Sequence, residues 1–164
     1  MPLTVCAEDR TSESISGPGT KAFVALAVVL PAIQGGENGR EFSLRTLDSL
    51  LTATLLSEGL KRLTRVPRPD TGTPDSFPSG HATAAFAVAT IAAERDPRAA
   101  PFWYAGAFAI AQSRVKLNRH RETDVLAGAL LGLAVGRIEL ASPSGLLFRV
   151  NNDGSKSVGF GLRF

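Results

Sequence analysis

Residues 78–95, PSGHATAAFAVATIAAER, decide the fold of this chain. The run over 82–93 is rich in alanine and carries no charge, which is typical of a helix packed closely on its neighbours. Ser79 stands at a natural N-cap position, so we expect a helix over 79–95. Its first turn would offer free backbone N–H groups and a partial positive charge, which favour a bound anion. Gly80 would let that anion approach the backbone closely.

Further helices follow from the pattern of apolar residues on either side of this run. The expected helices cover about residues 20–33, 43–66, 100–116 and 120–138. In the second of them, leucines recur at mixed three- and four-residue steps and form an amphipathic face. Pro31 and the pair Gly35-Gly36 are expected to stop the first one early. The expected fold class is therefore all-α, a compact bundle of about five to six helices.

Both ends of the chain differ from this central region. Residues 1–20 are polar and rich in glycine and serine, so we expect a disordered lead-in that lacks the apolar core of a signal peptide. Residues 21–140 would form the helical domain. Over 141–164, apolar residues alternate on both sides of a turn at 151–154, which predicts a β-hairpin tail. The alternating residues are Leu146, Phe148 and Val150, then Val158, Phe160, Leu162 and Phe164.

The chain has two histidines, His81 and His120, and both have neighbours suited to phosphate chemistry. His120 is followed four residues later by Asp124, so on a helix the two side chains stack on one face. A carboxylate there can accept from one ring nitrogen and leave the other as a nucleophile. His81, in the first turn of its helix, could protonate a leaving group. The plainer interpretations are a surface His–Asp pair and an ordinary capped helix.

Eight of the 18 Lys and Arg residues lie in two windows, 61–68 and 114–121, and neither window contains an acid. Lys61 and Arg68 are seven residues apart, two helical turns, before two prolines end the helix. Cations at that spacing can grip one oxyanion and stabilise charge that develops on it. Basic runs of this kind also occur in nucleic-acid-binding proteins, but the interleaved aromatic residues of a single-strand binder are sparse here. We therefore expect no nucleic-acid partner.

Three fragments occur in this order: Lys61-x6-Arg68-Pro69, Pro78-Ser79-Gly80-His81 and Ser113-Arg114-x5-His120-x3-Asp124. Together they resemble the signature of the type 2 phosphatidic acid phosphatase and vanadium haloperoxidase superfamily. All eleven fixed positions are present with the family's spacing. The signature spans residues 61–124, and the expected helices over roughly 20–138 are similar to the family's bundle.

The resemblance implies a role for each matching residue. His120 would be the nucleophile and form a phosphohistidine, Asp124 would orient it, and His81 would be the general acid. A helix N-terminus near His120 would lower its pKa and Asp124 would raise it, and the sequence leaves that balance open. The groups that would bind the phosphate oxygens are the side chains of Lys61, Arg68, Ser79 and Arg114 and the amide of Gly80.

The leading hypothesis is a metal-independent phosphatase that cleaves phosphate monoesters or pyrophosphates, including those of lipids, through a phosphohistidine. With two histidines and one cysteine, Cys6, no multi-metal cluster and no cofactor are expected, and vanadate would act only as an inhibitor. The first alternative is a haloperoxidase, which would hold vanadate as its cofactor in the same residues, although that branch of the family is typically much longer. The second is a non-catalytic module that binds anions or membranes through the basic windows alone.

Charge and hydropathy also bear on where the protein works. The net charge of +3 and the pI near 9.5 fit an anionic substrate or an anionic membrane surface. The longest charge-free stretches, 22–36 and 99–113, have fifteen residues each, short of the roughly eighteen or more of a spanning helix. Both membrane lipid phosphatases and soluble acid phosphatases belong to the superfamily. We expect a bundle at or near a membrane of the cell envelope, membrane-associated or periplasmic.

Overall fold

The computed structural model of the chain describes residues 3–35, 37–143, 145–150 and 156–158. Two short strands, β1 (Phe148–Val150) and β2 (Lys156–Val158), follow the helices. The helical elements are α1 (Leu3–Ser14), the π-helical turn η1 (Ile15–Gly19), α2 (Thr20–Gln34), α3 (Glu37–Thr64), α4 (Gly80–Arg95), α5 (Ala100–Lys116) and α6 (Glu122–Ala141). The predicted all-α bundle is confirmed, and each helix expected from the sequence is present with its ends shifted by a few residues.

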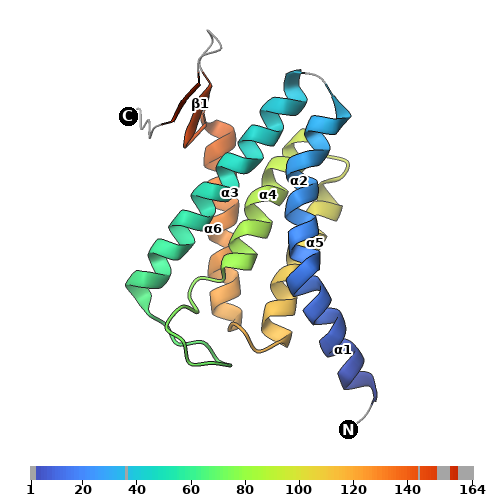
Figure 1. Cartoon of the computed structure of the whole chain (residues 1–164), viewed down its shortest axis with the longest axis vertical. Helices are drawn as coiled ribbons and strands as arrows, with labels where there is room; N and C mark the ends of the chain where they lie inside the picture. The colour runs from blue at the N-terminus through green and yellow to red at the C-terminus, as the bar shows by residue number, and fades with distance from the viewer. Residues whose placement is uncertain (1–2, 36, 144, 151–155, 159–164) are drawn as a thin grey trace.

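The alanine-rich helix α4 lies at the centre of the bundle and packs against α3, α5 and α6 (Figure 1). Most of its alanines are buried, and Ala85 and Ala89 expose no surface. Helix α6 turns Gly128, Gly132 and Gly136 towards α4, a contact we call the glycine seam. A Cβ on Gly132 would stand 2.3 Å from the carbonyl oxygen of Thr83. The two backbones therefore approach each other too closely for any side chain at these positions.

Residues 3–19 correct one prediction from the sequence. A disordered lead-in was expected over 1–20, but the described part of it is helical and continues into α2. Pro18 lies inside η1, and the Thr20 hydroxyl donates to two carbonyl oxygens of that turn at 3.0 Å each. Ile15 packs against a core cluster that α4 and α5 form. Tertiary packing thus outweighs the polar, glycine-rich composition that predicts disorder.

The continuous helix through α1, η1 and α2 is longer than the charge-free stretches that the sequence shows. Pro31 lies inside α2 without ending it, and the helix ends only at Gly35, whose φ is 93°. Within the described residues, the helix Asp9–Gln34 is long and apolar enough to cross a membrane. A count of charge-free residues misses this helix because Lys21 interrupts it. Core helices and signal sequences share these features, so length and composition alone do not establish a span.

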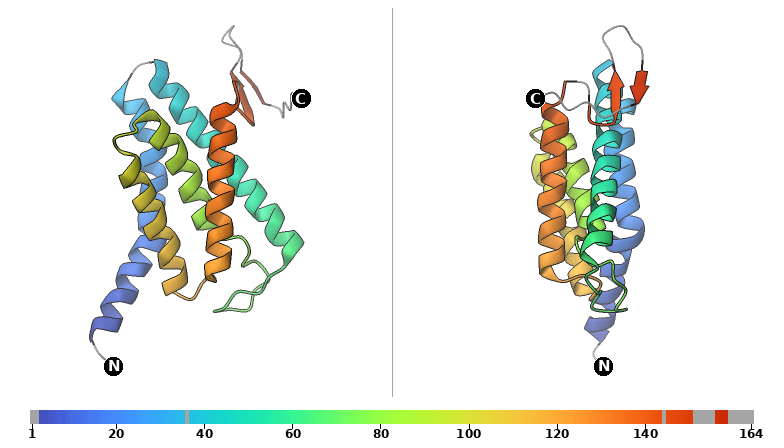
Figure 2. Two further views of the ribbon diagram at one scale, coloured as in Figure 1. Left: turned by 180° about the vertical axis from the view of Figure 1, so that it is seen from behind. Right: turned by 90° about the vertical axis from the view of Figure 1, so that its left-hand side faces the viewer.

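The predicted C-terminal hairpin is present in the described residues. Strand β1 pairs antiparallel with β2, with Phe148 opposite Val158. The expected turn at 151–154 and the alternating residues after 158 lie outside the described residues. Leu146, just before β1, packs against a core cluster of the bundle. The hairpin lies at the end of the bundle opposite to the N-terminus (Figure 2).

Candidate active site

The residues singled out in the sequence meet at the end of the bundle where the α3–α4 loop and the α5–α6 loop lie (Figure 1). The α3–α4 loop is tied to the start of α6, because the Ser79 N–H donates to the Asp124 carbonyl oxygen at 2.9 Å. His81 lies within electrostatic reach of four of the others, Lys61, Arg68, Arg114 and His120. The elements that supply the eight residues are the last turn of α3 (Lys61), the two loops (Arg68, Ser79, His120), the start of α4 (Gly80, His81), the last turn of α5 (Arg114) and the first turn of α6 (Asp124).

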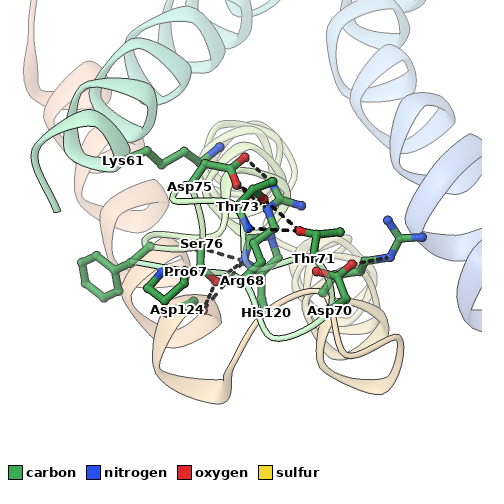
Figure 3. Close-up of polar contacts among 12 residues, drawn as sticks. Lys61, Pro67, Arg68, Asp70, Thr71, Thr73, Asp75, Ser76, His120 and Asp124 are labelled. Carbon is green, nitrogen blue, oxygen red and sulfur yellow. Dashed lines mark hydrogen bonds and ion pairs between the residues drawn. The ribbon is translucent and has the colours of Figure 1, made fainter. Parts of the chain in front are cut away.

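The His120 side chain is held by a backbone group. The residue is 2% exposed, and its Nδ1 lies 2.9 Å from the carbonyl oxygen of Ser76 (Figure 3). A carbonyl oxygen can only accept, so we assign the proton to Nδ1. In the neutral imidazole the lone pair then lies on Nε2. The geometry therefore selects the tautomer whose Nε2 can attack an electrophile.

Asp124 contacts His120 less directly than the i,i+4 spacing predicts. Its Oδ2 lies 3.9 Å from His120 Nδ1, too far for a hydrogen bond. Instead, Oδ2 accepts from the Ser76 hydroxyl at 2.6 Å and from the Arg121 N–H at 3.0 Å. Asp124 therefore holds Ser76 in place, and the Ser76 carbonyl holds the imidazole.

The N-terminus of α4 presents polar atoms that no protein group satisfies. Ser79 occupies the N-cap position, but its side chain makes no capping hydrogen bond, contrary to the expected cap. In the described part of the chain, the buried Oγ of Ser79, the Oγ of Ser57 and the Nε of Arg114 all have no hydrogen-bond partner. A Cβ on Gly80 would stand 3.3 Å from Lys61 Nζ and 3.6 Å from Ser57 Oγ. Because buried polar atoms without partners are costly, this end of α4 is suited to receive the oxygens of an anion.

Two of the predicted phosphate-binding cations are paired with acids. Lys61 Nζ lies 2.5 Å from Glu58 Oε1. Arg68 donates two hydrogen bonds of 2.8 Å to the carboxylate of Asp75 (Figure 3). Among the described residues, no group of three or more His, Cys, Asp or Glu side chains is placed to hold a metal ion. The positive charges of Lys61 and Arg68 can balance the charge of a bound anion.

The third cation, Arg114, connects the site to the N-terminal helix. It is 7% exposed, and its Nη1 donates to the hydroxyl of Ser16 in η1. Burial lowers the pKa of Arg114 to about 10, with Arg68 and Arg119 adding to the effect. At neutral pH Arg114 therefore remains a cation.

Both histidines are held in their neutral form. Burial, followed by the charges of Arg114 and His120, lowers the pKa of His81 to about 4. Burial, then Arg114 and Arg68, lowers the pKa of His120 to about 4, against the opposing effects of the Ser76 carbonyl and Asp124. The balance left open in the sequence thus falls on the side of a lowered pKa, through burial and neighbouring arginines. His120 is neutral at neutral pH, as a nucleophile must be.

Several residues beside the predicted set carry no mark in the signature, among them Ser16, Ser57, Glu58, Asp75 and Ser76. Ser57 lies one helical turn before Lys61, so the i,i+4 spacing is a signal that could have found it. Ser76 could not be found in this way, because its contact with His120 is made by the backbone carbonyl, which every residue has. Ser16 is distant in sequence and reaches Arg114 only through the tertiary fold.

The chain is similar to known proteins both in sequence and in fold. The model of the PAP2 superfamily matches residues 43–145. Over 75 residues the chain is 37% identical to a lipid A 1-phosphatase of Porphyromonas gingivalis. This match covers 43% of the chain and 17% of that protein, so the chain spans less than a fifth of the length of this relative.

Two solved structures share the fold. The crystal structure of Aquifex aeolicus LpxE is similar with a TM-score of 0.66 and 24% identity, over 87% of this chain and 88% of that one. A transmembrane PAP2-type phosphatidylglycerolphosphate phosphatase from Bacillus subtilis is similar with a TM-score of 0.56 and 23% identity, over 84% and 85% of the two chains. At these identities the likeness concerns the fold, and it extends well beyond the residues of the signature.

Proposed function

As the chain belongs to the PAP2 superfamily, we propose that it is a phosphatase that hydrolyses phosphate monoesters or pyrophosphates of lipids through a phosphohistidine. The observation that carries this proposal is the state of His120. Its Nδ1 proton is committed to the Ser76 carbonyl, which leaves a neutral Nε2 near Arg68 and Arg114. A neutral imidazole beside cations that can hold a phosphate is the arrangement that nucleophilic attack on phosphorus requires.

In the first step, His120 Nε2 forms a bond to phosphorus while the bond from phosphorus to the leaving oxygen breaks. Lys61, Arg68 and Arg114 stabilise the negative charge on the phosphoryl oxygens, together with the Ser79 hydroxyl and the Gly80 N–H. His81 gives its proton to the leaving oxygen. Because burial and neighbouring charges lower the pKa of His81 to about 4, a bound phosphate must raise it, as a nearby anion does for an imidazole.

In the second step, a water molecule attacks the phosphohistidine. His81, now neutral, takes a proton from that water, and the bond between phosphorus and Nε2 breaks. Inorganic phosphate leaves, and His120 returns to the tautomer that the Ser76 carbonyl selects. The positive side chains take the role that metal ions have in other phosphatases, so the reaction is proposed to be metal-independent and free of cofactors.

Two observations support the proposal of lipid substrates. The relatives named above are, by their names, phosphatases of lipid A and of phosphatidylglycerolphosphate. The outer faces of α2, α3, α5 and α6 also expose many large apolar side chains. On α2, for example, Leu26, Val29 and Ile33 form one stripe and are 48–74% exposed. Such surfaces suit contact with lipid, and they support the proposal that the protein works at a membrane of the cell envelope.

The test is phosphate release by the purified protein in mild detergent. The substrates are phosphatidate, an isoprenyl pyrophosphate, a sugar phosphate and an aryl phosphate, each with and without EDTA or orthovanadate. We expect the lipid substrates to be preferred, activity to survive EDTA and orthovanadate to inhibit. Loss of activity in EDTA that a divalent cation restores would contradict metal independence. Bromide oxidation by peroxide in the presence of vanadate, without phosphate release, would favour the haloperoxidase.

A further inference from the structure

The loop between α3 and α4 folds back on itself around Arg68 (Figure 3). The Arg68 N–H donates to the Thr73 carbonyl oxygen at 2.9 Å, and the Gly72 N–H donates to the Arg68 carbonyl oxygen at 3.0 Å. Gly72 has a φ of 71°, which favours glycine and allows this tight turn. The backbone of Arg68 is therefore fixed by the loop that follows it.

The Arg68 side chain is held by Asp75 from the same loop. Nε lies 2.8 Å from Oδ1 and Nη2 lies 2.8 Å from Oδ2, which is a two-bond ion pair. Asp75 is itself anchored, because the Thr73 hydroxyl donates to Oδ1 at 2.7 Å and the Asp75 N–H donates to the Thr73 carbonyl at 2.9 Å. The side chains of Arg68 and Asp75 are 19% and 44% exposed, so a substrate can reach the pair.

This ion pair occupies only one edge of the guanidinium group. An arginine has five N–H bonds, and Asp75 takes one from Nε and one from Nη2. Both hydrogens of Nη1 and the second hydrogen of Nη2 remain. One hydrogen from each of these nitrogens forms a second pair of donors on the adjacent edge. The two donors on that edge are spaced to donate hydrogen bonds to two oxygens of one phosphate group. Asp75 thus leaves an anion-binding edge of Arg68 open and fixes the direction in which it points.

We propose that Asp75 is the positioning residue of Arg68, and this inference rests on the phosphatase function proposed above. A free arginine side chain has many rotamers, and ordering it when the substrate arrives would cost binding energy. Asp75 orders it beforehand, which is how preorganised sites gain rate. Asp75 does not bind the phosphate, since two anions repel.

The charge of Asp75 is secured by its surroundings. The hydroxyl of Thr73, followed by the hydrogen bond and charge of Arg68, lowers the pKa of Asp75 against the opposing effect of burial. A second acid–arginine pair joins this loop to the α5–α6 loop, in which Asp70 Oδ2 lies 3.3 Å from Arg119 Nε. Arg119 lies outside the signature, so this pair is a matched control.

The experiment compares Asp75→Asn, Arg68→Ala and the double variant, with Asp70→Asn as the control. Three quantities are measured: kcat/KM for an aryl phosphate, the affinity for inorganic phosphate by calorimetric titration, and the melting temperature. We expect Asp75→Asn to lower kcat/KM and phosphate affinity about tenfold or more, in line with other residues that orient a binding group. Asp70→Asn should stay within about twofold, because its partner Arg119 is 49% exposed and lies outside the signature.

The double variant separates positioning from a general effect on folding. If Asp75 acts through Arg68, adding Asp75→Asn to Arg68→Ala causes no further loss. An equal loss with and without Arg68 would overturn the inference, and so would tighter phosphate binding by Asp75→Asn, because Asp75 would then compete with the substrate. Should Asp75→Asn melt early, Thr73→Val replaces it and is expected to show a smaller loss in the same direction. A wild type that binds phosphate but hydrolyses nothing would refute the proposed function alone, while the titration still decides the role of Asp75.

Discussion

Replacing Glu139 with Gln should stabilise the protein at pH 8 and leave it nearly unchanged at pH 4. Glu139 lies on α6 and is fully buried. Its Oε2 and the Oδ2 of Asp48 on α3 both accept from the Leu146 N–H, at 3.0 and 2.9 Å. Arg45 Nη1 lies 3.9 Å from Glu139 Oε1. Two acids thus share one backbone donor where the C-terminal segment joins the bundle.

The pKa of Glu139 determines the size of the expected difference in stability. Burial, and then the charge of Asp48, raises it from 4.5 to about 7, against the lowering effects of the Leu146 N–H and Arg45. Below pH 4.5 the folded and unfolded chains both carry the proton. As the pH rises to 7, the unfolded chain releases it first, so folding becomes less favourable across this window and changes no further above it. At about 1.4 kcal/mol for each pH unit, the wild type loses up to about 3 kcal/mol that Glu139→Gln keeps.

The assay is the melting temperature of both proteins in mild detergent at pH 4 and pH 8. A difference of about 3 kcal/mol corresponds to roughly 6–12 °C for a chain of this size. Histidines titrate in the same range, but their effect cancels between the two proteins. The control is Glu41→Gln, because Glu41 also pairs with Arg45 but is 58% exposed. If Glu139→Gln changed stability equally at both pH values, folding would not raise the pKa of Glu139 and the reasoning would be wrong.

The remaining predictions concern the site and the membrane. His120→Ala should abolish turnover and any acid-labile phosphoenzyme, seen by radiolabelled phosphate, whereas His81→Ala should slow mainly substrates with poor leaving groups. Arg114→Ala should raise the barrier by about 3 kcal/mol in kcat/KM, and Arg62→Ala, outside the signature, should change it little; equal losses would indicate a diffuse basic patch. Because the pKa of both histidines falls from 6.5 to about 4 on folding, stability should drop as the pH falls from 6.5 to 4, measured by thermal melting. In cell fractions the protein should sediment with membranes, and recovery in the soluble fraction without detergent would contradict the proposed location.

The sequence predicts the bundle well where helices carry clear local signals. Helix α4 is one example, since an uncharged alanine-rich run follows a serine and a glycine. The N-terminal residues 3–19 lack such signals, and their helix depends on packing by Ile15 and Ser16 against distant parts of the chain. Local propensity alone does not contain that information.

The candidate site is likewise predicted only in part by the sequence. The ordered spacing of charged and histidine residues predicts which side chains meet at one end of the bundle. It does not predict how they are held, because Asp124 acts through Ser76 and Arg68 is held by Asp75. Those contacts depend on the path of the α3–α4 loop, whose sequence of Pro, Asp, Thr and Gly predicts only that it turns.

The glycine seam between α4 and α6 has a consequence for how this protein can change. His81 lies in the first turn of α4 and Asp124 in the first turn of α6, so the seam sets the spacing of two groups that the proposed chemistry needs. A single added methyl group at Gly132 must move one helix, because the two nearest atoms it meets belong to the backbone of α4. Substitutions that preserve function should therefore accumulate on the outer helix faces, where a changed side chain does not press on the backbone of another helix. Selection for a new substrate should act on those faces and on the loops first.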